Sequence, residues 1–147
     1  MGGWRSWWPF RRNSGPVHLR AGVWGEDVAR GHLEGKGYKT LGVRVRVGRH
    51  DELDLVMRSP DEVLVFVEVK TRASEVMGRP RAAVGRVKSG RVMRAGVGYM
   101  KKLREKPKFF RFDVVEVIGT EGSGVEPEVR HIENAFQLPA NMRVYQP

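Results

Sequence analysis

The chain of 147 residues has the length of one folded domain, and its hydrophobic fraction of 40% is enough for a modest core. Its 27 lysines and arginines against 17 acids give a formal net charge of +10, which favours a polyanionic partner such as nucleic acid. The absence of cysteine excludes disulfides and thiolate metal sites. No apolar run is long enough to cross a membrane, so we expect a cytoplasmic protein with no membrane partner.

Residues 1–16 mix three tryptophans and three arginines with glycine, serine and proline, and they show no helical or strand periodicity. We expect a flexible tail here, followed by a single domain over residues 17–147. Two sharper interpretations stay open. The tail is either an arm that stacks on unpaired bases or an anchor at a membrane surface, the latter being the weakest hypothesis for the protein.

The first half of the domain reads as one helix and two strands. The spacing of Val28, Ala29 and Leu33 predicts a helix over residues 17–36, with Gly37 just beyond its end. Alternating apolar residues then predict strands over residues 40–47 and 51–58. The alternation places Leu41, Val43, Val45 and Val47 on one face of the first strand. In the second it places Leu53, Leu55 and Met57 on one face and Glu52, Asp54 and Val56 on the other.

The second half begins with a strand over residues 63–71 that is apolar on both faces at its start, as in the centre of a sheet. A basic helix is predicted over residues 79–106, with Val92, Ala95, Gly96, Tyr99 and Leu103 on its apolar face. Strands over residues 109–118 and 129–132 flank an acidic, glycine-bearing loop. The predicted order is αβββαββ, an α/β fold.

The charged residues at the strand ends suggest a metal site. If residues 51–58 and 63–71 form a hairpin centred on Asp61, Asp54 faces Glu68 and Glu52 faces Lys70 on one side of the sheet. Opposed carboxylates repel unless a cation lies between them. Mg²⁺ commonly binds through one or two carboxylates, water and a substrate phosphate. Asp54 and Glu68 are therefore the expected ligands.

Lys70 lies two residues after Glu68, so strand geometry brings its ammonium group to the same face. There it would orient the attacking water and stabilise the charge that develops on a scissile phosphate. The competing interpretation is a charged strand end at which Glu52 and Lys70 form a surface ion pair of little energy. The catalytic interpretation is favoured over the surface ion pair, because two acids oppose each other at the end of an apolar strand and a basic helix follows.

Several segments together resemble the bacterial YraN-like family, whose members look like small PD-(D/E)xK endonucleases related to archaeal Holliday-junction resolvases. The likeness spans about residues 25–136. It rests on Gly25-Glu26, Asp51-Glu52-Leu53-Asp54-Leu55, the run from Val65 to Arg72, the region of Gly78 and Lys88, Arg111-Phe112-Asp113, and the run from His131 to Phe136.

The resemblance implies a restriction-endonuclease-like core, with a mixed central sheet flanked by helices. It implies that Asp54, Glu68 and Lys70 form the catalytic motif, with Glu26 as an additional acid. The carbonyl of Val69 would be a further metal ligand. Lys88 would reach the site from the second helix. Family members have glycine where this chain has Asp51, and this extra carboxylate is a candidate influence on metal preference.

Two functional hypotheses follow. The first is an endonuclease that uses Mg²⁺, with Mn²⁺ as the alternative ion, on structured or branched DNA; a homodimer would suit symmetric cleavage. The second is a non-catalytic nucleic-acid-binding module on the same scaffold. In both, the expected nucleic-acid contacts are cationic residues after the third strand and along the basic helix, namely Arg72, Arg86, Lys88, Arg91, Arg94, Lys101 and Lys102.

Overall fold

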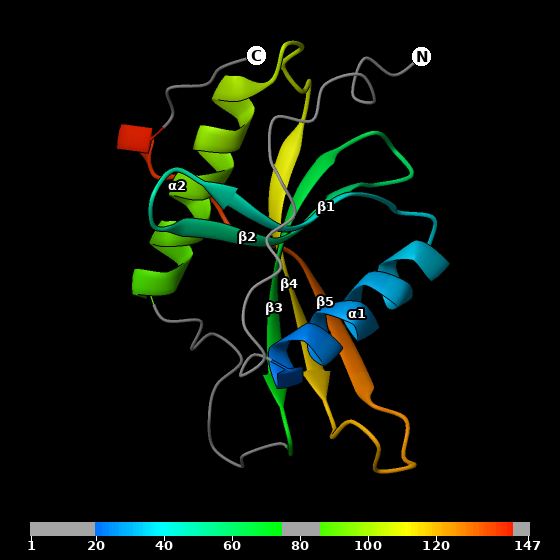
Figure 1. The fold of residues 1–147 in the computed structure, drawn as a ribbon. Coiled ribbons are helices and arrows are strands. Elements are labelled where there is room, and N and C mark those ends of the chain that lie inside the picture. The colour runs from blue at the N-terminus through cyan, green and yellow to red at the C-terminus, as the bar shows by residue number, and fades with distance from the viewer. Residues whose placement is uncertain (1–19, 75–85, 143–147) are drawn as a thin grey trace.

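The computed structural model describes residues 20–74 and 86–142. The predicted tail and the predicted start of the basic helix, residues 79–85, lie outside these ranges. The element order matches the prediction (Figure 1). The elements are α1 (Arg20–Gly35), β1 (Lys39–Val47), β2 (Asp51–Arg58), β3 (Leu64–Arg72), α2 (Arg86–Lys102), β4 (Phe110–Ile118), β5 (Glu128–Phe136) and a short 3₁₀ turn, η3 (Ala140–Met142).

The five strands form one mixed sheet in the order β1-β2-β3-β4-β5. Neighbouring strands are antiparallel except for β3 and β4, which are parallel and joined across α2. The sheet therefore has β3 at its centre, as its two apolar faces predicted. In Figure 1 the ends of β3 and β4 and the beginning of α1 lie at the same end of the molecule.

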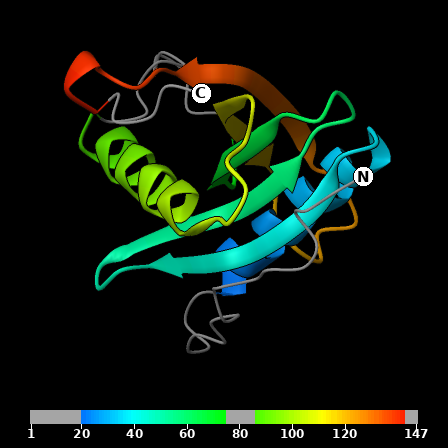
Figure 2. The same cartoon turned by 90° about the horizontal axis from the view of Figure 1, so that it is seen from above.

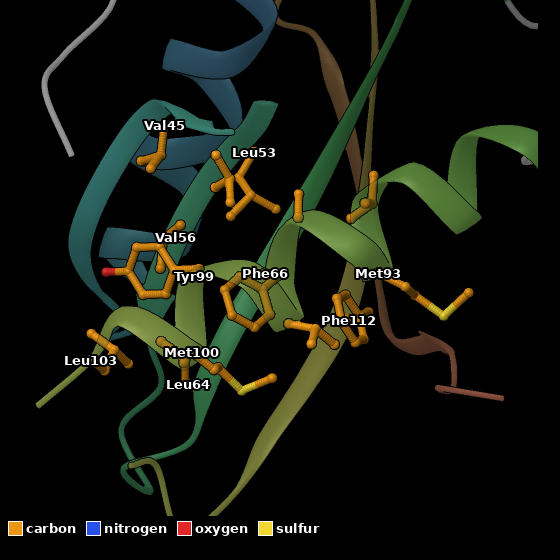
Figure 3. Packing of buried hydrophobic residues seen from close by; sticks show 14 of the residues in the cluster. Val45, Leu53, Val56, Leu64, Phe66, Met93, Tyr99, Met100, Leu103 and Phe112 are labelled. Atoms are coloured by element: carbon orange, nitrogen blue, oxygen red, sulfur yellow. The ribbon is translucent and has the colours of Figure 1, made fainter. Parts of the chain in front are cut away.

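The two helices cover opposite faces of the sheet, and each covers its own core (Figure 2). Phe66 and Phe112 stack at the centre of the core under α2, and Tyr99 meets Phe66 edge-on (Figure 3). The core under α1 is aliphatic. It contains Ala29, Leu33, Leu55, Met57, Val65, Val67, Val69, Val115 and Val117, with Tyr38 at its edge. The predicted apolar faces of both helices are thus confirmed.

The predicted single apolar face of β1 and of β2 is wrong, because the hairpin that they form changes faces partway along. Leu55 packs under α1, whereas Leu53 packs under α2. The register steps from Val43↔Leu55 directly to Val45↔Leu53, and Arg44 between them has a φ of +49°. This left-handed backbone is uncommon for a residue with a side chain. It turns the outer half of the hairpin toward α2.

Element ends differ from the prediction in two places. α2 ends at Lys102 rather than near residue 106, since the ammonium of Lys106 donates to the carbonyls of Met100, Lys101 and Leu103 and closes the helix end. β5 extends to Phe136, well beyond the predicted residue 132. The second half of β5 has no apolar alternation that would predict a strand, because β5 is an edge strand with many polar residues. Gly37, with a φ of +90°, does follow α1 as predicted.

Neither of the two helices described is long and apolar enough to cross a membrane.

Candidate metal and phosphate site

The site begins where the β2–β3 ladder ends. Pairing runs from Arg58↔Leu64 to Leu55↔Val67, which is the register predicted from a hairpin centred on Asp61. One step further, the Asp54 side chain takes the place of a backbone partner: its Oδ2 accepts a hydrogen bond from the Val69 amide at 2.9 Å. Asp54 therefore lies along the edge of β3, next to the backbone of Val69. The hydrogen bond from the Val69 amide to its carboxylate holds the Asp54 side chain there.

This bond also orients the carbonyl of Val69. In an extended strand the N–H and C=O of one residue point to the same side, toward the same neighbouring strand. The Val69 carbonyl therefore faces the edge of β3 that Asp54 approaches. This arrangement brings a carboxylate and a carbonyl oxygen, both hard donors, to the same edge of β3, and the roles of the two residues as metal ligands stay a prediction.

Glu68 and Lys70 lie on the face of β3 that packs under α2, because they continue the alternation of Leu64 and Phe66. The Glu68 side chain is 3% exposed, and its Oε1 lies 3.6 Å from the Nζ of Lys70, whose side chain is 22% exposed. A buried carboxylate thus has its ion-pair partner two residues away, on its own strand. The lysine keeps partial access to solvent.

Glu116 is an acid of this region that the sequence patterns did not single out. The parallel register places it beside Lys70, and the next strand places Arg130 beside Glu116 on the same face. Glu116 is 5% exposed. Glu116 therefore neighbours Lys70 in the sheet, on the face of β3 and β4 that also carries Glu68. No motif in the sequence links residue 116 to the site, since only the β3–β4 register brings it there.

Glu26 approaches from α1, and it is also largely buried at 9% exposure. Its Oε2 accepts a hydrogen bond of 2.6 Å from Nε of Arg44 on β1. Burial raises the pKa of Glu26, and the bond from Arg44 opposes that shift. The same bond is the main reason that the pKa of Arg44 is raised, with the charges of Glu26, Glu52 and Asp54 adding to it. Arg44 is thus a cation among three carboxylates, and the strand pattern did not identify it.

Close approach of α1 to β3 requires the glycine before Glu26. A Cβ built on Gly25 would overlap Oγ1 of Thr71 and lie 3.0 Å from its Cβ. Only a residue without a side chain allows the helix to lie this close to the end of β3. The Gly25-Glu26 pair therefore has a physical reason: the glycine sets the position of the helix, and the helix positions the acid.

The donor set decides whether a metal fits. The carboxylates of Asp54 and Glu68 and the carbonyl of Val69 are oxygen donors of the kind that Mg²⁺ and Mn²⁺ prefer. Within residues 20–74 and 86–142, no cluster of three or more Asp, Glu or His side chains is arranged to hold an ion. A metal here would therefore depend on water and substrate phosphate for its remaining ligands, as is usual for Mg²⁺.

The predicted nucleic-acid contacts fall into three groups. Arg91, Lys101 and Lys102 are exposed on α2, and Arg72 is half-buried at the end of β3. Arg94 is exposed, but its Nε and Nη2 both donate to Asp51, at 2.8 and 2.9 Å. Asp51 is thus engaged with α2. Arg86 and Lys88 lie in the first turn of α2, where the described residues include the backbone but not these side chains, so the expected reach of Lys88 stays a prediction.

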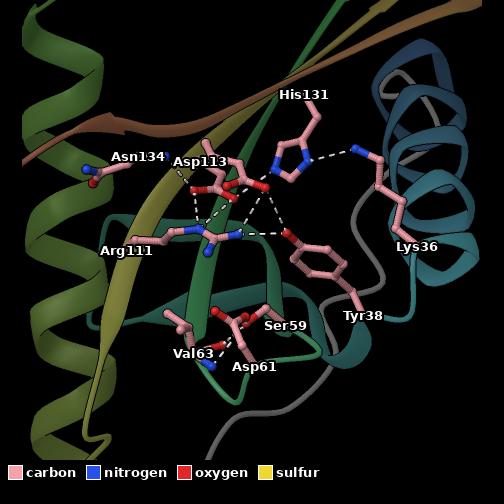
Figure 4. Close-up of polar contacts among 10 residues, drawn as sticks. Lys36, Tyr38, Ser59, Asp61, Val63, Arg111, Asp113, His131 and Asn134 are labelled. Atoms are coloured by element: carbon pink, nitrogen blue, oxygen red, sulfur yellow. Dashed lines mark hydrogen bonds and ion pairs between the residues drawn. The ribbon is translucent and has the colours of Figure 1, made fainter.

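Other residues of the resemblance form a separate buried network (Figure 4). Asp113 is fully buried and accepts hydrogen bonds from Arg111, from the Asn134 amide and from Nε2 of His131. Arg111 also donates to the hydroxyl of Tyr38 at 2.7 Å. These hydrogen bonds lie where the pairing of β4 with β5 is irregular, because the register shifts there and Asn134 has a φ of +50°. The network has a structural role, since it closes the sheet around this shift.

Comparison with known proteins places the chain among bacterial relatives. The model of the uncharacterised protein family UPF0102 matches residues 25–117. A UPF0102 protein of Syntrophomonas wolfei is 42% identical over 123 residues, which cover 82% of this chain and 100% of that protein. A UPF0102 protein of Syntrophotalea carbinolica is 41% identical, with 82% and 94% of the two chains covered. One of Bifidobacterium longum is 38% identical, with 78% and 91% covered.

Proposed function

The chain belongs to the UPF0102 family, and from its site we propose that it is a metal-dependent endonuclease that hydrolyses phosphodiester bonds in structured or branched DNA. The observation that carries the proposal is the junction at the end of the β2–β3 ladder. There Asp54 is bonded to the Val69 amide, and Glu68 and Lys70 lie on the adjoining residues of β3. We also propose that the chain is related to the PD-(D/E)xK nucleases and shares their restriction-endonuclease-like core.

The oxygen atoms of Asp54, Glu68 and the Val69 carbonyl would hold a Mg²⁺ ion. When bound, the ion would supply a Lewis acid for the phosphate and lower the pKa of a coordinated water. Hydrolysis would join the water oxygen to phosphorus and break the bond from phosphorus to the leaving sugar oxygen. The ammonium of Lys70 would orient the water and stabilise the added negative charge on the phosphate.

The surroundings support this assignment of roles. Glu68 is buried, and a buried carboxylate is costly unless a cation accompanies it. Lys70 supplies one positive charge at 3.6 Å, and a divalent ion would supply more. The net charge of +10 would draw a polyanionic substrate toward the site.

The test is cleavage of fluorescently labelled DNA by the full-length protein. A four-way junction, a flap and a linear duplex of the same sequence are incubated with Mg²⁺, Mn²⁺ or EDTA. Parent protein should cut a branched substrate only with metal. Asp54→Asn, Glu68→Gln and Lys70→Ala should each lower the rate on the order of 10²–10³-fold or more. Asp27→Asn on the exposed side of α1 is the matched carboxylate control, and Lys39→Ala is the matched lysine control.

The alternative is a nucleic-acid-binding module that uses the nuclease scaffold without turnover. The observation in its favour is that the described residues hold no group of three acidic or histidine side chains arranged for a metal. Binding of branched DNA without metal-dependent cleavage of any substrate would establish this alternative. Cleavage by Asp54→Asn at the parent rate would also reject the endonuclease, because the variant keeps the shape of the ligand but not its charge.

A further inference from the structure

The outer half of the β1–β2 hairpin is anchored on α2. Its inner side carries Val45, Val47 and Leu53, which pack into the core under that helix. A Cβ built on Gly98 of α2 would lie 2.8 Å from Cγ1 of Val47, so the hairpin lies directly on the helix backbone. The bidentate ion pair of Arg94 with Asp51 attaches the turn as well. The hairpin is therefore packed on α2 along its inner side and tied to it by an ion pair.

The outer side of the same hairpin is cationic. Arg46 on β1 and Arg49 and His50 in the turn are exposed. Arg91 of α2 is exposed as well, and its charge and that of His50 both help to lower the pKa of Asp51, after its hydrogen bond from Arg94. We call Arg46, Arg49, His50 and Arg91 the hairpin patch. In Figure 2 the turn between β1 and β2 reaches the edge of the molecule beside α2.

Two acids, Asp51 and Glu52, lie at the start of β2 beside this patch, and one of them is already engaged. Asp51 is neutralised by Arg94. Glu52, the register partner of Arg46, is the exposed acid of the hairpin. Asp54 is the fourth residue of β2 after His50 in the turn, a distance of about 13 Å at the usual rise per strand residue. A polyanion that lies on the patch would therefore extend to the candidate metal site.

We propose that the β1–β2 hairpin is the element that contacts a duplex arm of the nucleic-acid substrate, through the phosphates on either side of a groove. The inner side of the hairpin is covered by α2, so a duplex arm would lie across the outer side, where the exposed arginines would reach its phosphates. The proposal rests on the proposed function. In this proposal Arg94 has a structural role, as the partner of Asp51, and is no longer a DNA contact. The main DNA-binding surface is the hairpin and not the length of α2.

The experiment measures binding without catalysis. Anisotropy of a labelled duplex and of a four-way junction is titrated with full-length protein in EDTA at several KCl concentrations. Arg46→Ala with Arg49→Ala removes two charges from the hairpin patch. Lys101→Ala with Lys102→Ala removes two exposed charges from the far end of α2 and is the matched control. A third variant, Glu52→Gln, removes the exposed acid of the hairpin.

The hairpin variant should bind at least tenfold more weakly at low salt. Its slope of log K against log salt should be smaller by about 1.8, since each lost phosphate contact removes about 0.9. The α2 variant should lose less than the hairpin variant, and Glu52→Gln should bind more tightly than the parent. An equal or larger loss in the α2 variant would overturn the proposal, and so would a parent protein that does not bind duplex at low salt.

The same titrations separate this inference from the proposed enzyme. Because EDTA prevents metal-dependent chemistry, they report contact with the hairpin whether or not the protein cleaves DNA. Hairpin-dependent binding by a protein that cuts no substrate would support the hairpin inference and reject the endonuclease. Metal-dependent cleavage with binding that is insensitive to the hairpin variant would do the reverse.

Discussion

Gly25→Ala tests the contact that places Glu26 at the site. The new methyl group would overlap Oγ1 of Thr71 and lie 3.0 and 3.2 Å from its Cβ and Cγ2. A change of the Thr71 rotamer can move Oγ1 away, but the Cβ of Thr71 is fixed to the backbone of β3 and stays 3.0 Å from the new methyl group. Either α1 or the end of β3 must move. The acid next in the chain would move with the helix.

Gly31→Ala is the matched control, because it lies in the same helix and a Cβ there meets nothing within 4 Å. Both variants gain the same helix propensity, so the difference between them isolates the clash. Overpacking typically costs about 1–3 kcal/mol, and the three contacts with Thr71 place this case at about 2–3 kcal/mol. For a chain of this length each kcal/mol shifts Tm by about 2–4 °C.

The assay is thermal unfolding of parent, Gly25→Ala, Gly31→Ala, and each of these in a Thr71→Gly background. Gly31→Ala should melt at or above the parent, and Gly25→Ala clearly below Gly31→Ala. In the Thr71→Gly background that gap should close, because the atoms that clash are gone. If the two alanine variants melt together, or if the gap persists without the Thr71 side chain, then the explanation of Gly25 is wrong.

Three further predictions concern single charged groups. Asp54→Asn should leave the metal-free stability near the parent value but abolish any rise in Tm on adding Mg²⁺ or Mn²⁺. Lys70→Ala should keep that rise. A metal-dependent rise in Tm of Asp54→Asn would show that Asp54 is not a metal ligand. Burial raises the pKa of Glu26 above its ordinary value of 4.5, so ionisation costs more in the folded than in the unfolded chain. The parent should therefore lose stability relative to Glu26→Gln as pH rises from about 4 to about 7, and a Tm difference that is constant with pH would contradict this. Asp113→Asn should cost about 1–3 kcal/mol of unfolding free energy, measured by urea denaturation, because it removes the buried charge that accepts hydrogen bonds from Arg111 and His131 and leaves the half-buried Arg111 with Glu133 as its acidic partner. A variant as stable as the parent would show that the network contributes little.

Sequence patterns were sufficient for the elements and for the central register. Apolar periodicity in the helices and the two apolar faces of β3 are properties of consecutive residues, and they are fixed by local geometry. The β2–β3 pairing followed from a short turn, Ser59 to Asp61, because a tight hairpin leaves few alternative registers. Asp54, Glu68 and Lys70 could thus be assigned to one end of one sheet without a structure.

Other features depended on residues far apart in the chain. The reversal of faces in the β1–β2 hairpin comes from the left-handed backbone of Arg44, and that conformation accompanies an ion pair with Glu26 on another element. Glu116 lies beside Lys70 only through a parallel register across α2. Local periodicity has no information about either contact.

The sequence by itself determined which side chains could perform chemistry and along which strands they lie. The tertiary structure decided what each of them faces. It gave Asp54 the Val69 amide as a partner, paired Arg94 with Asp51, and left Arg46 and Arg49 of the β1–β2 hairpin exposed. The physical reason is that charge and periodicity are local properties of a chain, whereas the partner of a charged group depends on which distant segments pack together.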